Sequence, residues 1–145
     1  MDVQCQCGAV SFRTPSSVPQ AVFHCHCTQC QAQSASAFGT SAVFPTNGIF
    51  PLSPELEARL GLYNRPAERA DSGRVVRCYF CKTCGVRLMH LGIEKDGSPR
   101  SFVSVKGGNI KGLDWSSATH IYTESAVVPI PAGVKSFPRA PSPSS

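Results

Sequence analysis

Apolar and polar residues alternate over several short segments of this chain, and a period of two is typical of strands with one buried face. Residues 8–14 (GAVSFRT), 101–105 (SFVSV) and 119–123 (THIYT) show the alternation most clearly. Other extended segments adjoin glycine, proline or Asn-Gly, as strands that run into turns do. The predicted strands are residues 8–14, 37–44, 74–80, 86–91, 101–105 and 119–123. We therefore predict a mainly β fold.

A helical pattern is present in one short segment, residues 54–60 (PELEARL). Its proline stands at the start, two acidic residues follow, and Gly61 would end the helix. The composition points the same way, because the chain has 12 glycines and 12 prolines while only 16% of its residues are charged. We expect at most one or two short helices.

The length of 145 residues corresponds to about one domain. From Ser136 onward the sequence SFPRAPSPSS has almost nothing to bury, which favours a flexible tail. No apolar run approaches the roughly 20 residues of a membrane span, so we expect no membrane association. We predict a single domain over residues 1–135 and a tail over residues 136–145.

Eight cysteines are the main chemical feature of the chain, and in an exported protein they could form four disulfides. The first residues, MDVQCQCGAV, lack a basic segment followed by a long apolar one, so we do not expect export. CxC and CxxC pairs are also too closely spaced to join distant loops, but they suit two ligands of one tetrahedral metal ion. We expect a zinc protein in a reducing, cytoplasmic compartment.

Two of the cysteine pairs are followed by glycine and together predict a closed zinc site. The sequences are CQCG at residues 5–8 and CKTCG at residues 81–85, where the glycine permits a tight turn. The predicted ligands of this structural site are Cys5, Cys7, Cys81 and Cys84. These cysteines could instead be buried thiols that only pack. An iron–sulfur cluster at Cys78, Cys81 and Cys84 would lack the fourth cysteine and the proline of the ferredoxin motif.

The third cysteine cluster, CHCTQC at residues 25–30, predicts an open zinc site. It provides three thiolates within six residues and no obvious fourth ligand nearby. Three protein ligands with a free position are typical of catalytic rather than structural zinc. The side chains that could close the site instead are Cys78, His24, His26 and His90.

Basic residues are concentrated between residues 65 and 87, where only Glu68 and Asp71 oppose them. The cations are Arg65, Arg69, Arg74, Arg77, Lys82 and Arg87. Such a segment could attract a small anionic substrate or a nucleic acid, or it could be a solvated face without a ligand.

Together these motifs resemble the glutathione-dependent formaldehyde-activating enzymes and their centromere-protein-V-like relatives. The matching segments are CQCGAVSF (5–12), CHCTQC (25–30), SASAFG (34–39), FCKTCGVRL (80–88) and HIYTESAVVPIP (120–131). The resemblance covers nearly the whole chain except the tail. It implies a mainly β, Mss-four-like fold with two zinc ions per chain.

Carried over by motif, the resemblance implies that Cys5, Cys7, Cys81 and Cys84 hold the structural zinc. It also implies that Cys25, Cys27 and Cys30 hold the catalytic zinc, in agreement with the division reached from spacing. Cys78 has no counterpart in these motifs.

The implied activity is that of a carbon–sulfur lyase that forms or cleaves an adduct of the S-hydroxymethylglutathione type. Glutathione or another thiol would be the cosubstrate, and a thiol coordinated to zinc is largely deprotonated. Tyr122 is a candidate for proton transfer or positioning, as are His120 and Glu124, although each also fits an ordinary strand position. Arg77 and Arg87 are candidates for contact with a substrate carboxylate.

The sequence departs from this family at positions that bear on the substrate. Many members have a basic residue directly after the third cysteine and a glycine a few residues later, where this chain has Gln31 and Ala35. Residues 126–129 (AVVP) stand where many members have a tryptophan. The substrate could therefore be another thiol conjugate or an aldehyde metabolite.

A non-enzymatic zinc module that contacts a protein or a nucleic acid is the alternative function. The basic segment supports it, but this segment lacks the interleaved aromatic residues of a single-strand binder and an evident recognition helix. We therefore expect a small-molecule thiol, rather than a nucleic acid, as the partner. Sequence gives no prediction of the oligomeric state.

Overall fold

The computed structural model describes residues 1–141 of the chain, and in these residues ten strands form two sheets with two short α-helices. The strands are β1 (Asp2–Gln4), β2 (Ser11–Arg13), β3 (Ala21–Cys25), β4 (Gly39–Pro45), β5 (Leu60–Arg65), β6 (Val76–Cys81), β7 (Arg87–Ile93), β8 (Pro99–Lys106), β9 (Thr119–Ile121) and β10 (Ser136–Phe137). The helices are α1 (Thr28–Ser34) and α2 (Pro54–Arg59), with 3-10 turns η1 (Ala67–Arg69), η2 (Gly107–Asn109) and η3 (Thr123–Ser125). The prediction of a mainly β fold is confirmed. None of the helices in this part of the chain has the length and apolar character needed to cross a membrane.

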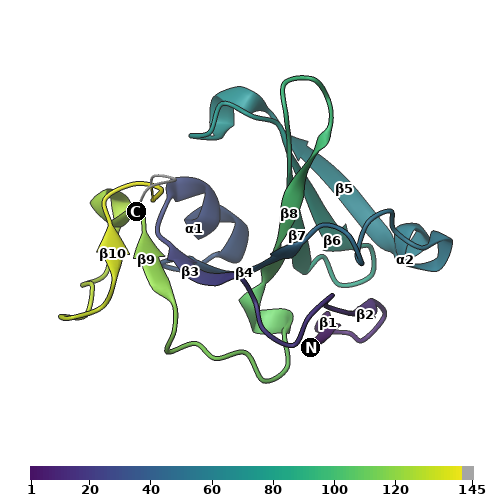
Figure 1. Cartoon of the computed structure of the whole chain (residues 1–145), viewed down its shortest axis with the longest axis horizontal. Coiled ribbons are helices and arrows are strands. Elements are labelled where there is room, and N and C mark those ends of the chain that lie inside the picture. The colour runs from purple at the N-terminus through teal and green to yellow at the C-terminus, as the bar shows by residue number, and fades with distance from the viewer. Residues whose placement is uncertain (142–145) are drawn as a thin grey trace.

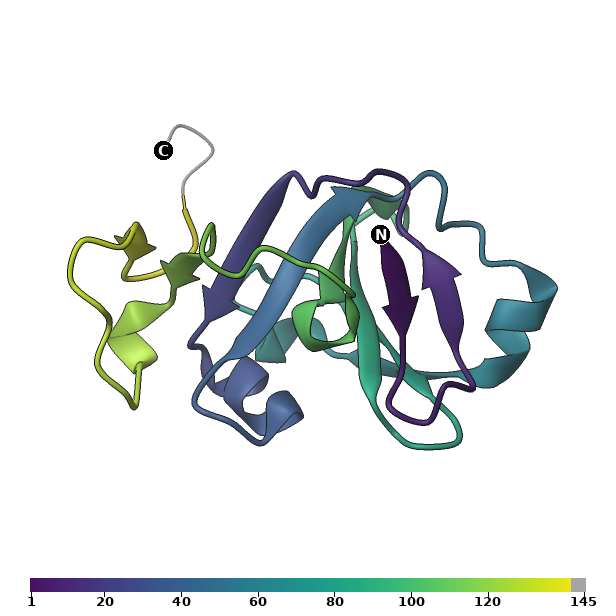
Figure 2. The same ribbon diagram turned by 90° about the horizontal axis from the view of Figure 1, so that it is seen from below.

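Eight strands form one long, twisted sheet in the order β10-β9-β3-β4-β8-β7-β6-β5 (Figure 1). Neighbours from β3 and β4 through β8 to β5 are antiparallel, whereas β9 pairs in parallel with both β3 and β10. β1 and β2 form a separate antiparallel ribbon, drawn in purple in Figure 2, which lies beside the β7–β8 part of the sheet. An isolated bridge between Val3 and Ile110 joins the ribbon to the segment after η2.

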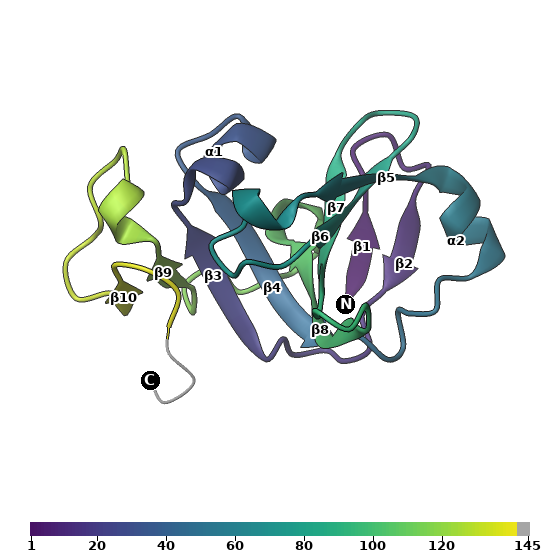
Figure 3. The same cartoon turned by 90° about the horizontal axis from the view of Figure 1, so that it is seen from above.

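The hydrophobic core lies on the face of the sheet that the ribbon covers. Cross-strand partners on this face are fully buried: Phe44 lies opposite Val103, which in turn lies opposite Leu91. Val3 of the ribbon packs into the same cluster. Because successive strand residues point to opposite faces, the residues between these positions form the other face, on which α1 lies (Figure 3).

Each predicted strand overlaps an observed one, and the predicted helix corresponds to α2. The sequence pattern did not predict β1, β3, β5, β10 or α1. Gly61 was expected to end the helix, yet it lies inside β5. A Cβ at this position would lie 2.3 Å from Cζ of Phe80 on β6, so glycine is needed for close packing between the strands. α1 has no amphipathic pattern, and its first turn is instead part of the CHCTQC cluster.

The segment predicted as a tail is described up to Pro141, and residues 142–145 lie outside the described residues. Its first two residues form β10, in which Ser136 pairs with His120 and Phe137 with Ile121. Arg139 then forms an ion pair with Glu124, Nε to Oε1, at 3.0 Å. This part of the C-terminal segment therefore lies along β9.

Candidate metal centres

Four cysteines from the two glycine-terminated motifs meet beside the β1–β2 ribbon. Their sulfur atoms all lie within 4.8 Å of one another, with 3.6 Å between Sγ of Cys5 and Cys7 and 3.8 Å between Sγ of Cys7 and Cys81. Zn–S bonds of about 2.3 Å in a tetrahedron place sulfur atoms about 3.8 Å apart. The donor set of Cys5, Cys7, Cys81 and Cys84 thus has the chemistry and spacing of a closed zinc site.

Backbone amides in both turns point at these sulfur atoms. The N–H of Val10 donates to Sγ of Cys5 at 3.2 Å, and the N–H of Thr83 donates to Sγ of Cys81 at 3.4 Å. Gly8 and Gly85 have φ values of +78° and +75°, which allow the chain to turn around the sulfurs. Backbone hydrogen bonds lower the pKa of Cys81 and favour the thiolate that a metal ion needs.

The other three clustered cysteines lie where β3 meets α1. Cys25 ends β3, Cys27 is the N-cap of α1, and Cys30 lies in the helix. Their sulfur atoms also lie within 4.8 Å of one another, with 3.5 Å between Sγ of Cys25 and Cys27. These residues could hold a metal ion through three thiolates, and within residues 1–141 no fourth side chain joins their group.

The four side chains that could have closed this site have other partners. Nδ1 of His24 lies 2.8 Å from Oγ1 of Thr40, and Nε2 of His26 lies 2.9 Å from Nδ1 of His120. Nε2 of His90 lies 3.1 Å from Nη1 of Arg87, and the Cys78 thiol donates to the Val76 carbonyl at 3.4 Å. Cys78 is fully buried outside both clusters.

Close packing of the three thiols shifts the pKa values of Cys27 and Cys25 in opposite directions. Hydrogen bonds from Cys25 and Cys30 lower the pKa of Cys27 to about 2, whereas hydrogen bonding with Cys27 raises the pKa of Cys25. Negative charge in the free cluster is therefore concentrated on Cys27, the half-buried member at the cavity wall.

A buried lysine, Lys106 at the end of β8, supplies positive charge near this cluster. Its Nζ donates to Oγ of Ser41 at 3.0 Å. Burial lowers its pKa, while the charges of Cys30 and Cys25 act in the opposite direction. Sequence reasoning missed Lys106, because the alternation of residues 101–105 gives no sign that the next residue turns inward beneath α1.

The three-cysteine cluster opens into a cavity of about 790 Å³. The segment around η1 and the segment around η3 form its walls, and both lie near α1 in Figure 3. Charged side chains of both signs line it: Arg65, Arg69, Arg139, Glu68, Asp71 and Glu124.

One set of these charges joins the two walls. The Tyr122 hydroxyl donates to Oδ2 of Asp71 at 3.2 Å, and Arg139 pairs with Glu124 at 3.0 Å and with Asp71 at 3.9 Å. Tyr122 has a φ of +58°, which is costly for a bulky residue and directs its ring into this contact. Burial and the adjacent Asp71 carboxylate raise the pKa of Tyr122, so its hydroxyl remains protonated.

A second set of charges has no ion-pair partner within the described part of the chain: Arg65, Arg69 and Glu68. Nε of Arg65 is buried and donates no hydrogen bond to any group of residues 1–141. Sequence reasoning grouped Arg65 and Arg69 with the other basic residues but did not single them out for the site.

The cations that were singled out, Arg77 and Arg87, do not line this cavity. Arg77 lines a separate cavity, and Arg87 lies beside His90 and Cys78 in a smaller one. Tyr122 and Glu124 do line the cysteine cavity, whereas His120 stacks on His26 with ring centroids 5.2 Å apart. The basic segment is thus divided among different surroundings rather than collected into one site.

Gln31 and Ala35, where the sequence departs from the resembling family, have structural roles in the same loop. The Gln31 amide donates to the carbonyls of His26 at 2.7 Å and Ser125 at 2.9 Å, and so joins the cysteine loop to η3. Ala35 ends α1 with a φ of +48°, a left-handed conformation that glycine adopts with less strain.

Replacement of Ala35 by glycine should raise the free energy of unfolding by about 0.5–1 kcal/mol. Relief of the left-handed strain outweighs the larger entropy of glycine in the unfolded chain. Urea unfolding of the metal-loaded protein measures the difference. Ala32→Gly is the matched control, because Ala32 lies inside the same helix and its replacement should lower stability by a similar amount. Loss of stability in both variants would contradict the strain at Ala35.

A family model described as glutathione-dependent formaldehyde-activating enzyme matches residues 1–125. The match includes both cysteine clusters and every residue that lines the cysteine cavity except Arg139. No curated protein matches the chain.

Proposed function

Because the chain belongs to the glutathione-dependent formaldehyde-activating enzyme family, we propose that it is a zinc-dependent carbon–sulfur lyase. It would form or cleave the adduct between a thiol and an aldehyde. The observation that carries this proposal is the cluster of Cys25, Cys27 and Cys30, whose three thiols meet at the wall of a charged cavity.

The proposed reaction is reversible and needs no oxidant. In one direction the thiol sulfur forms a bond to the aldehyde carbon, the carbonyl oxygen gains a proton, and the thiol proton is lost. In the other direction the carbon–sulfur bond breaks and the hydroxyl proton leaves. A bound zinc ion would supply positive charge that favours the thiolate form of the substrate.

The two cysteine clusters would have different roles. Cys5, Cys7, Cys81 and Cys84 would hold a structural ion with a complete set of four ligands. Cys25, Cys27 and Cys30 would hold the ion of the reaction, and Lys106 would offset part of their negative charge from the buried side.

The unpaired charges of the cavity suit a thiol with both carboxylate and ammonium groups. Glutathione has two carboxylates and one ammonium group besides its thiol. Arg65 and Arg69 would bind the carboxylates, and Glu68 would bind the ammonium group. The buried Nε of Arg65 would gain the partner that it lacks.

The Tyr122 hydroxyl lies on the same cavity wall and is kept protonated by burial and by Asp71. We therefore assign it the donation of a proton to the aldehyde oxygen when the carbon–sulfur bond forms. The contacts among Tyr122, Asp71 and Arg139 would also hold the η1 and η3 walls together around the substrate.

Titration of the cobalt-substituted protein with glutathione tests this function. We expect glutathione to change the visible spectrum of cobalt, and we expect Arg69→Gln to weaken this binding roughly tenfold or more through loss of a charged hydrogen bond. Lys95→Gln, which removes an exposed cation that lines no described cavity, should leave the affinity unchanged. If glutathione, cysteine and their formaldehyde adducts all leave the spectrum unchanged, the lyase proposal fails.

A further inference from the structure

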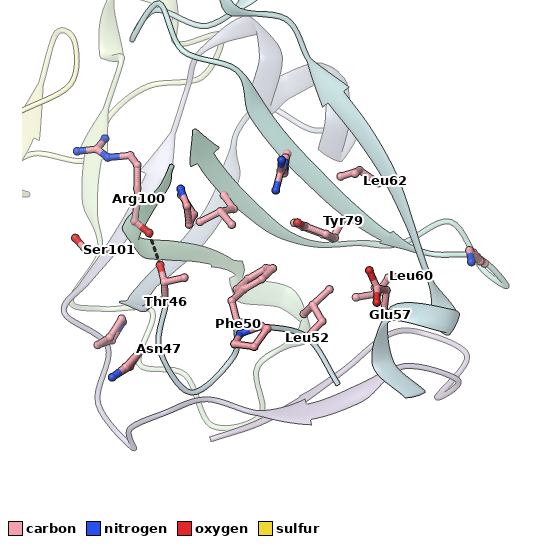
Figure 4. A pocket seen from close by; sticks show the side chains of 16 residues that line it. Thr46, Asn47, Phe50, Leu52, Glu57, Leu60, Leu62, Tyr79, Arg100 and Ser101 are labelled. Atoms are coloured by element: carbon pink, nitrogen blue, oxygen red, sulfur yellow. Dashed lines mark hydrogen bonds between the residues drawn. The ribbon is translucent and has the colours of Figure 1, made fainter. Parts of the chain in front are cut away.

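A cavity of about 1300 Å³, larger than the cavity at the three cysteines, is not lined by any of the eight cysteines. Strands β5 and β6 form one wall, and the loop from Pro45 to Leu52 together with α2 forms another (Figure 4). In this view the side chains of Phe50, Leu52, Leu62 and Tyr79 converge on the same space. No role in the proposed lyase reaction accounts for this cavity.

Strand alternation separates this cavity from the cysteine site. Leu62 pairs with Tyr79, and Arg77 pairs with both Asn64 and Leu91, so these side chains share one face of the sheet. Arg65 lies one residue beyond Asn64 and therefore points to the opposite face, where it lines the cysteine cavity. The two cavities lie on opposite sides of β5 and β6.

Half of the sixteen lining residues are apolar, and half of Leu62 is still exposed to solvent. The apolar lining residues are Pro45, Phe50, Pro51, Leu52, Leu60, Leu62, Leu91 and Pro99. A cavity with an apolar lining and a few polar groups is the usual form of a small-molecule site. The lining thus favours a ligand with an aromatic or branched apolar body.

Of the three cations around this cavity, two have other partners. The Arg100 guanidinium pairs with Glu94 at 3.2 Å and lies 4.2 Å from the Phe102 ring centroid, and Nζ of Lys82 donates to the Ala58 carbonyl at 2.9 Å. Arg77 has no ion pair within residues 1–141.

Arg77 also lies beside the hydroxyl of Tyr79. Burial raises the pKa of Tyr79, and the nearby guanidinium offsets part of this rise. One free arginine and one phenol hydroxyl therefore meet at an apolar surface. The acid of the lining, Glu57, comes from α2 and affects Tyr79 less than Arg77 does. An anionic group fits the Arg77 end of the cavity.

We propose that this cavity is a second ligand site, which binds a small carboxylate with an aromatic or branched apolar body. The carboxylate would accept hydrogen bonds from Arg77 and Tyr79, and the apolar body would lie on Phe50, Leu52 and Leu62. The site does not depend on the three-cysteine cluster or on the lyase reaction, because its residues lie on the other face of β5 and β6.

Two fluorescent dyes test the proposal on the metal-loaded protein. The probes are 8-anilinonaphthalene-1-sulfonate, which is anionic, and N-phenyl-1-naphthylamine, its neutral counterpart. We expect saturable binding of one anionic dye per chain, and Arg77→Gln should weaken it about tenfold while it leaves the neutral dye unaffected. Leu62→Gln should weaken both dyes, and Arg77→Lys should retain most of the affinity for the anionic dye.

Displacement then identifies the carboxylate. 4-Phenylbutyrate should compete with the bound anionic dye, whereas 4-phenylbutanol, which has the same body and no charge, should compete at least tenfold less well. Arg69→Gln is the control from the other face and should leave dye binding unchanged, with unfolding curves to show that each variant is folded. The absence of saturable dye binding, or equal effects of Arg77→Gln and Arg69→Gln, would overturn the proposal. Neither outcome bears on the cobalt titration.

Discussion

Replacement of Cys84 by alanine should unfold the protein and release the metal ion of the four-cysteine site. Cys84 is half-buried, so the loss of its side chain from packing is small. The expected effect comes from the metal ion: a structural zinc site contributes about 10–16 kcal/mol of apparent binding free energy, which is as large as the whole stability of a typical domain. The β1–β2 ribbon, which is too small to be stable alone, would lose its attachment to β6 and β7.

Cys78→Ala is the matched control for this variant. Cys78 is more deeply buried than Cys84, with only 1% of its surface exposed, but it belongs to neither cysteine cluster. A packing effect would make Cys78→Ala the more damaging change, whereas a metal effect would make Cys84→Ala the more damaging one. Circular dichroism and zinc content measure the two outcomes. A folded Cys84→Ala variant with two zinc ions per chain would contradict the structural role.

The cysteine clusters could be predicted from sequence because their chemistry depends on local spacing. Ligands two or three residues apart, as in CQCG and CKTCG, reach one metal ion in almost any fold that allows the turn. The structure brings together the same seven cysteines and leaves Cys78 apart. The strands of the core were predictable for a similar reason, since alternation along residues 101–105 is a local property.

The charged residues of the cysteine cavity could not be chosen from sequence, because they depend on strand register. Arg65 and Arg77 belong to the same basic segment, but they lie on opposite faces of the β5–β6 pair, in which Arg65 pairs with Val76 and Asn64 with Arg77. A shift of one residue in β5 would place Arg65 opposite Arg77, and both arginines would then lie on the same face. The pattern around Gly61 gave no strand at β5, so the register that separates the two arginines was not available.

The burial of Lys106 could not be predicted from the sequence either. Its burial depends on the pairing of Ser41 with Lys106 and on the position of α1, which contains Cys30. Lys106 is more than 60 residues away in the chain from both Ser41 and α1. Local hydrophobic periodicity therefore identifies the strand that contains Lys106 but not the thiols that this side chain meets.

Replacement of Cys27 by alanine should remove one zinc ion per chain and reduce the lyase activity by about a thousandfold or more, while the fold remains intact. Loss of one thiolate leaves only Cys25 and Cys30 to hold the ion, and the positive charge that favours the substrate thiolate is worth several kcal/mol. Cys27 is half-buried at the N-cap of α1 and makes no side-chain cap hydrogen bond, so we expect the free energy of unfolding to change by no more than about 1–2 kcal/mol. Zinc content, thermal unfolding and turnover of the glutathione–formaldehyde adduct measure the three effects, with Cys78→Ala again as the control that keeps both ions. Two zinc ions in Cys27→Ala, or unfolding as complete as that of Cys84→Ala, would contradict the division of the cysteines into one structural and one reactive site.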